Sequence, residues 1–323
     1  MKMNSSKLFF LSFMMIGIMF CLCSNNWLFI WCGLELSLIT FLPLIQSKMI
    51  MSSESSVKYF LVQSISSSIL ILGLMMMLMS KLNYNFFIAL SAMIKMGVAP
   101  FHSWLPSLID GLYILPLILM FTFLKIPPLI VVTFTDLSLS LFISLTMMVG
   151  SLFGLNQSSS RKIITYSSIF NIGLILMCIG NNFIWMFYLL IYSSLVVTFM
   201  MLIQHMNMNY LNQIIYSEQY IFNKLILLFN LLSMGGMPPL IGFSIKLIVI
   251  EFCIQIGIIF NLFMMILFSL MVMFFYIRVC YFSMMFYCIN FKWNLTSINY
   301  FNLFLLLINF LSLPLVLILT GFY

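Results

Sequence analysis

Four ionisable side chains, Glu35, Lys95, Lys125 and Lys246, each lie near the centre of a different apolar segment. A charge buried in a membrane is costly, so residues of this kind are functional candidates by default. Burial disfavours the charged form of a lysine or a glutamate, and an opposite charge nearby restores it. Small rearrangements can therefore switch the protonation of these sites, which predicts a path for protons or ions.

His102 follows the first lysine in the run Lys95-Met-Gly-Val-Ala-Pro-Phe-His102. An imidazole titrates near neutral pH, so His102 could relay protons, or it could instead cap broken backbone. Structural alternatives exist for the other residues as well. Glu35 and Lys95 could form an ion pair that only fixes helix packing, and Lys125 could extend toward the membrane surface.

Composition places the chain in a bilayer. Of its 323 residues, 64% are hydrophobic and 6% are charged, which leaves too little polar surface for a soluble globule. The formal net charge of +7 comes from lysines and arginines spread thinly along the chain, so nucleic acid is not an expected partner. The seven cysteines include no C-x-x-C pair, so no metal site is expected.

The apolar runs are long and continuous, as expected for helices that each need about 20 residues to cross the hydrocarbon core. We predict eleven such helices in a single membrane domain over residues 1–323. They span residues 8–24, 27–45, 57–79, 86–104, 112–134, 137–155, 163–180, 183–204, 224–252, 256–282 and 300–321.

Basic residues segregate between the two sets of connections. The odd-numbered loops hold only Lys81. The N-terminus and the even-numbered loops hold Lys2, Lys7, Lys48, Lys58, Arg161, Lys162, Lys224 and Lys292. The positive-inside rule therefore predicts an N-terminus in the matrix or cytoplasm and a C-terminus on the opposite side.

Two predicted helices contain glycine and proline at mid-membrane. Met96-Gly-Val-Ala-Pro100 follows Lys95, and the similar Met234-Gly-Gly-Met-Pro238 precedes Lys246. Such breaks are tolerated only where protein or a wet cavity covers the freed backbone groups. The two breaks are five helices apart and cross in opposite directions, which is typical of transporter folds built from inverted repeats. We assign approximate repeats to residues 8–134 and 137–282, followed by a C-terminal helix at 300–321.

Four motifs resemble the antiporter-like membrane subunits of respiratory complex I, particularly their mitochondrial, insect-like members. These motifs are Trp31-Cys-Gly-Leu-Glu35, Lys95-Met-Gly-Val-Ala-Pro-Phe-His-Ser-Trp-Leu-Pro106, Leu155-Asn-Gln-Ser-Ser-Ser-Arg-Lys-Ile-Ile-Thr-Tyr-Ser-Ser-Ile169 and Gly235-Gly-Met-Pro-Pro-Leu-Ile-Gly-Phe-Ser-Ile-Lys246. The resemblance covers nearly the whole chain in order. It implies an all-α polytopic membrane protein with an inverted-repeat antiporter-like fold, two discontinuous helices and a place in the mitochondrial inner membrane.

By the same resemblance, Glu35 is the acid paired with Lys95, Lys125 links inward along the membrane plane, and Lys246 lies on the distal part of a proton route. Many relatives have a histidine at the position of Asn171, so a relay role is not carried over there. Other membrane-arm subunits and lipids are the implied partners. NADH, FMN, iron-sulfur clusters and ubiquinone are expected in other subunits, because this chain lacks a C-x-x-C pair and a glycine-rich nucleotide loop.

Two other functions fit the same residues. A stand-alone cation/proton antiporter could use the same buried lysines, and a structural membrane scaffold could use the charges only to orient its helices. Association with redox subunits distinguishes a proton-translocating complex I subunit from the antiporter. Uncoupling of turnover by substitutions at Glu35 or Lys95 distinguishes it from the scaffold.

Overall fold

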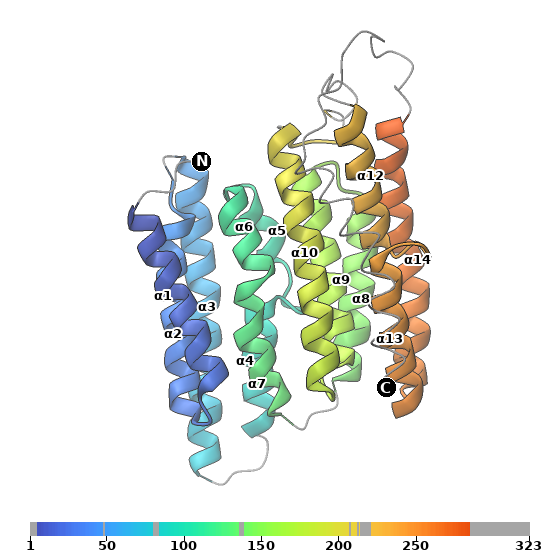
Figure 1. The fold of residues 1–323 in the computed structure, drawn as a ribbon. Helices are drawn as coiled ribbons and strands as arrows, with labels where there is room; N and C mark the ends of the chain where they lie inside the picture. The colour runs from blue at the N-terminus through green and yellow to red at the C-terminus, as the bar shows by residue number, and fades with distance from the viewer. Residues whose placement is uncertain are drawn as a thin grey trace. The chain divides into compact units, whose positions relative to one another are not determined.

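The computed structural model describes residues 5–47, 49–79, 84–135, 139–206, 208–211, 213 and 221–284. Every regular element within these ranges is helical, and the chain divides into two compact units, residues 1–146 and 147–323 (Figure 1). The predicted all-α membrane class is confirmed. The predicted helix at 300–321 lies outside the described residues, so the total of eleven helices and the two inverted repeats remain predictions.

Unit 1 contains the first five predicted segments. Its elements are α1 Ser5–Cys23, α2 Trp27–Ile45, α3 Ile50–Leu78, α4 Tyr84–Met96, α5 Trp104–Ile109, α6 Ile114–Phe121, η1 Phe123–Lys125 and α7 Ile126–Thr133. Helices α1 and α2 approach closely at Gly17 and Gly33, where an added Cβ on Gly33 would lie 2.6 Å from the Gly17 carbonyl oxygen. Small residues at such contacts let helices pack without a hydrophobic driving force.

Unit 2 is built around one central helix. Its elements are α8 Ser140–Leu155, within which the unit boundary falls, α9 Ser160–Met177, α10 Asn182–Met206, α12 Ile221–Gly235, α13 Ile241–Ile256 and α14 Ile259–Met284. Helix α9 is buried along almost its whole length and contacts α10, α13 and α14. Its polar side chains therefore lie inside the unit, away from lipid.

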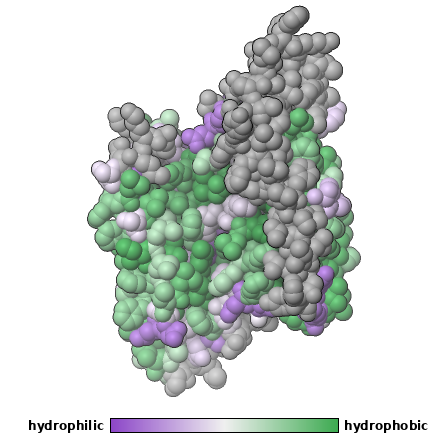
Figure 2. Space-filling view, in the orientation of Figure 1, coloured by the Kyte–Doolittle hydropathy of each residue, from purple (hydrophilic) through white to green (hydrophobic). Residues whose placement is uncertain are grey.

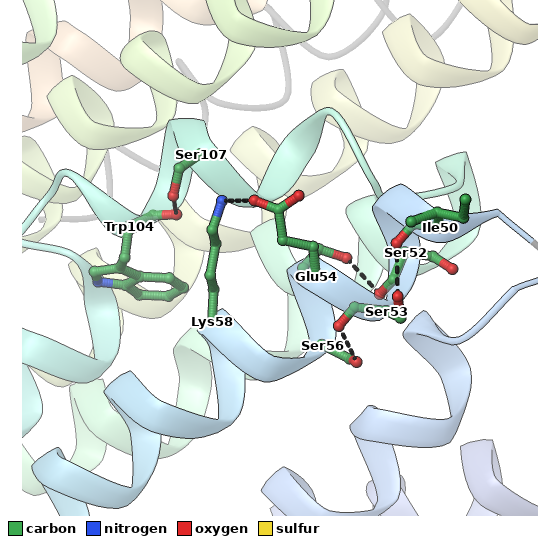
Figure 3. Close-up of polar contacts among 9 residues, drawn as sticks. Ile50, Ser52, Ser53, Glu54, Ser56, Lys58, Trp104 and Ser107 are labelled. Carbon is green, nitrogen blue, oxygen red and sulfur yellow. Dashed lines mark hydrogen bonds and ion pairs between the residues drawn. The ribbon is translucent and has the colours of Figure 1, made fainter.

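Helix α3 begins at Ile50 rather than at the predicted residue 57. Ser52 and Ser53 donate their hydroxyls to carbonyls three residues earlier, over 2.6 and 2.7 Å, which satisfies these polar groups inside the helix. Lys58 and Glu54 form an exposed ion pair across one turn of the same helix (Figure 3). These interactions therefore stabilise a polar first part of α3, before the apolar segment predicted from residue 57.

The outward-facing side chains are apolar, as a lipid environment requires. Leu78 is 82% exposed and Ile259 is 75% exposed. Figure 2 shows hydrophobic residues over most of the visible coloured surface, with hydrophilic residues near the helix ends. Six helical stretches in the described part of the chain are long and apolar enough to cross a membrane. Other apolar helices are shorter; α4 and α12 are among them because they end at the breaks, at Met96 and Gly235.

The contact between α12 and α13 depends on a glycine. A Cβ placed on Gly242 would lie 1.6 Å from the Ser233 carbonyl oxygen, so any side chain forces the two helices apart. We expect Gly242→Ala to lower stability by about 1–3 kcal/mol through overpacking. The measurement is thermal unfolding of the detergent-solubilised protein followed by circular dichroism.

Gly180→Ala is the matched control, because the nearest atom to its added Cβ is 3.6 Å away. That substitution should change stability by less than about 0.5 kcal/mol. Equal unfolding midpoints for the two variants would contradict the close packing of α12 on α13.

Candidate functional site

Helix α4 ends one residue after Lys95, in a turn that only glycine fits well. Gly97 has a φ of +73°, its N–H donates to the Ile94 carbonyl at 3.1 Å, and the Val98 N–H donates to the Met93 carbonyl at 3.0 Å. These two bonds form a Schellman motif, which satisfies carbonyls at the end of a helix. The side chain of Lys95 is 8% exposed and lies in the last turn before this break.

Lys95 and Lys125 line the same cavity in unit 1. Its volume is about 30 Å³, which is enough room for a water molecule. The polar residues in its wall are Ser37, Tyr59, Gln63, Lys95, Trp104 and Lys125. The Trp104 indole N–H is buried and has no hydrogen-bond partner among the described residues.

Lys125 lies at a third helix interruption, which the sequence analysis did not count among the discontinuous helices. The predicted segment 112–134 is split into α6, the short 3₁₀ helix η1 and α7, and Lys125 is the last residue of η1. Pro127 and Pro128 cannot donate backbone hydrogen bonds, which accounts for the tighter turn just before them. The Lys125 ammonium lies 5.4 Å from the centre of the Phe121 ring, in a cation–π geometry.

Glu35 influences Lys95 through its charge. The two groups interact electrostatically, but no salt bridge within 4.0 Å joins them in the described part of the chain. One carboxylate oxygen of Glu35 is buried and has no hydrogen-bond partner in the described part of the chain. The charge of Glu35 also acts on Tyr59, so the acid influences two residues of the cavity wall. The direct pairing of Glu35 with Lys95 remains a prediction.

His102 lies outside the cavity wall, on the segment between α4 and α5. It is partly exposed, and its Nδ1 is 3.1 Å from the carbonyl oxygen of Pro100. Of the two roles the sequence left open, this contact matches the capping of broken backbone. Its function as a relay is not tested by the structure.

The second break, between α12 and α13, repeats the geometry of the first. Gly236 has a φ of +87°, its N–H donates to the Ser233 carbonyl at 3.1 Å, and the Met237 N–H donates to the Leu232 carbonyl at 3.1 Å. Gly97 therefore corresponds to Gly236, one residue later than the sequence comparison suggested. The shift arises because only the glycine with positive φ can occupy this turn position, whereas Gly235 is still helical.

Lys246 reaches back from α13 to the end of α12. Its ammonium donates a hydrogen bond to the Gly235 carbonyl, and its side chain is 8% exposed. A Cβ on Gly236 would lie 2.9 Å from the Lys246 nitrogen, so the glycine also makes room for the lysine. A cation at the C-terminus of a helix complements the partial negative charge there.

Asn171 is fixed by its neighbours in the core of unit 2. The Tyr188 hydroxyl donates to its side-chain oxygen at 2.7 Å, and its amide donates to the Ser167 carbonyl at 2.8 Å. An amide does not titrate near neutral pH, so Asn171 orients the groups around it.

Sequence reasoning missed four polar residues of the unit 1 cavity: Ser37, Tyr59, Gln63 and Trp104. Tyr59 and Gln63 are four residues apart on α3 and share a face of the helix. Their helical spacing within an apolar segment could have indicated that both line a polar site. Trp104 stood inside the motif around Lys95, but nothing local showed that it lines a cavity.

Known proteins match this chain over most of its length. The family model "NADH:quinone oxidoreductase/Mrp antiporter, TM" matches residues 24–274. NADH-ubiquinone oxidoreductase chain 2 of Anopheles gambiae is 37% identical over 87% of this chain and 86% of its own length. The Aedes aegypti protein of the same name is 36% identical over 100% of this chain and 99% of its own length.

A solved structure shares the fold. A chain of respiratory complex I from Thermus thermophilus, determined with bound aureothin, superposes with a TM-score of 0.80. It is 20% identical, and the match covers 88% of this chain and 71% of that chain. The resemblance inferred from the sequence motifs is confirmed by the family model and the mosquito relatives.

Gln63 supports the broken end of α4, because its amide donates to the Lys95 carbonyl over 3.4 Å inside the unit. We expect Gln63→Leu to lower stability by about 1–3 kcal/mol, since it leaves a buried acceptor without its donor. Thermal unfolding in detergent measures this loss.

Gln157→Leu is the matched control. Gln157 also donates its amide to a main-chain carbonyl, that of Phe153, but on the surface, where water can replace it. An equal loss in both variants would mean that burial of the Gln63 bond has no energetic consequence.

Proposed function

The chain belongs to the NADH:quinone oxidoreductase/Mrp antiporter family of membrane subunits, and from that premise we propose that it translocates protons in the membrane arm of respiratory complex I. Its partners in that assembly are the other membrane-arm subunits and the surrounding lipids. Electron transfer from NADH to ubiquinone takes place in other subunits, which hold the FMN and the iron-sulfur clusters.

The observation that carries this proposal is the cavity shared by Lys95 and Lys125. A Lys95 ammonium gives up one proton to a water molecule in the cavity, and the neutral amine of Lys125 takes up one proton from that water. One N–H bond breaks, another forms, and the water is regenerated. A change in the charge near either amine reverses the direction of transfer.

Glu35 supplies that electrostatic change. A carboxylate near a lysine favours the ammonium form, so we assign to Glu35 the control of Lys95. Lys95 and Lys125 therefore form two proton sites in unit 1, and Glu35 controls the transfer between them. Lys246 forms the distal site in unit 2, where the helix break holds its ammonium inside the protein.

The protein is placed in the mitochondrial inner membrane as a multi-pass subunit. The surplus of lysine and arginine in one set of connections supports an N-terminus in the matrix and a C-terminus in the intermembrane space.

Lys95→Met tests the central site, because methionine retains an unbranched apolar chain and removes the charge. We expect proton translocation, and the NADH:ubiquinone turnover coupled to it, to fall about tenfold or more in the assembled complex. Proton uptake into proteoliposomes and quinone reduction are measured together.

Lys58→Met is the control, since Lys58 is a surface lysine 41% exposed in its ion pair with Glu54 (Figure 3). It should leave both rates unchanged. If Lys95→Met reduces assembly and activity in parallel, with the proton yield per electron preserved, the chain is a structural scaffold.

Gentle extraction of native membranes tests the assembly. The chain is expected to comigrate with NADH:ubiquinone reductase activity when intact complexes are separated. Migration as a small species without that activity would favour the stand-alone cation/proton antiporter.

A further inference from the structure

Three basic side chains of unit 2 belong to the region where α8 ends and α9 begins. Arg161 and Lys162 lie in the first turn of α9, directly after the connection from α8. Arg278 of α14 contacts that connection, because its guanidinium donates hydrogen bonds to the carbonyls of Leu155 and, over 2.9 Å, of Gln157. The proton sites proposed above use none of these three cations.

The helices that carry or contact these cations supply no negative charge of their own. The sequences of α8, α9 and α14 contain no aspartate and no glutamate. A guanidinium has five N–H donors, and the two bonds from Arg278 to main-chain carbonyls occupy two of them. The same bonds hold the planar group at the end of α8, in a fixed orientation that suits a phosphate. The region is therefore suited to bind an anion.

The outer surfaces of α8 and α14 are apolar. The two helices are in contact, since a Cβ built on Gly154 of α8 would lie 2.9 Å from the ring of Phe275 on α14. Met148 of α8 is 42% exposed and Phe274 of α14 is 61% exposed. A cationic end beside an exposed apolar surface matches the two parts of a phospholipid, its phosphate and its acyl chains.

We propose that α8, α9 and α14 form a binding site for an anionic phospholipid. Its phosphate contacts Arg278 together with Arg161 and Lys162, and its acyl chains lie along the exposed faces of α8 and α14. Basic pockets between membrane helices recognise anionic headgroups in this way. The exposed apolar surface favours a lipid over an acidic protein segment. This site does not depend on proton translocation by the chain.

The headgroup charge makes the site selective. A zwitterionic phospholipid carries a cation of its own beside the phosphate, and this cation is repelled by the three basic side chains. An anionic headgroup such as that of phosphatidylglycerol has no such cation. Phosphatidylglycerol should therefore bind more tightly than phosphatidylcholine with the same acyl chains.

Photolabelling of the assembled complex tests the site. The complex is reconstituted in phosphatidylcholine vesicles that contain a trace of phosphatidylglycerol with a photoactivatable acyl chain. Labelled peptides are identified by mass spectrometry, and their yield is compared with that of the exposed residues Leu72 and Met75 of α3. We expect enrichment of label on α8 and α14. Excess unlabelled phosphatidylglycerol should remove this enrichment, and the same excess of phosphatidylcholine should leave it.

Lys162→Gln tests the headgroup contact, because it removes one charge from a half-buried side chain. We expect the enrichment to fall about fivefold, the contribution of one basic residue near a membrane surface. Lys162→Arg is the matched control, since it keeps the charge and should keep the enrichment. Both variants should retain the rate of quinone reduction, because Lys162 lies outside the proposed proton sites.

Three results would overturn the site. Equal competition by the two phospholipids would mean that the label comes from lipids without a specific site. Absence of label from α8 and α14 would mean that another subunit covers this face. Equal enrichment in Lys162→Gln and Lys162→Arg would show that charge at this position does not hold the headgroup. If Lys162→Gln fails to assemble, the competition measured on the unaltered complex decides.

Discussion

A backbone carbonyl without a hydrogen-bond donor raises the free energy of a protein inside a bilayer. The structure of the two helix breaks beside Lys95 and Lys246 follows from the need to avoid this cost. At each break a glycine with positive φ turns the chain so that two N–H groups return to the helix end. Side chains provide further donors to the carbonyls at these helix ends: Gln63 donates to the carbonyl of Lys95, and Lys246 donates to the carbonyl of Gly235. The polar groups at the breaks are thereby held inside protein, away from lipid.

The same constraint explains why buried lysines stand beside interruptions. A lysine in an unbroken apolar helix has few polar groups near its ammonium, whereas a helix end provides free carbonyls and space. Lys246 donates a hydrogen bond to a carbonyl at such an end. Lys125 is the last residue of a 3₁₀ helix and lines the same cavity as Lys95. Helix breaks therefore serve as stable sites for buried lysines.

Much of the architecture was predictable, because segment length and apolar composition are set locally. The ten predicted segments that fall on described residues correspond to helices or split helices of the structure. The start of α3 was not predicted, because its serines satisfy their hydroxyls within the helix and extend it past the apolar run. The interruption at Lys125 was also not predicted, although Pro127 and Pro128 mark it.

The sequence by itself determined the membrane class, the identity of the buried charges and the presence of two breaks that contain glycine and proline, since each follows from the chemistry of neighbouring residues. Only the tertiary structure decided which of these groups meet. It joined Lys95 and Lys125 in one cavity, left Glu35 and Lys95 without a salt bridge among the described residues, and placed Tyr188 of α10 against Asn171 of α9. The reason is that nearly uniform apolar helices carry no periodic signal of their rotation, so packing alone sets which side chains face inward.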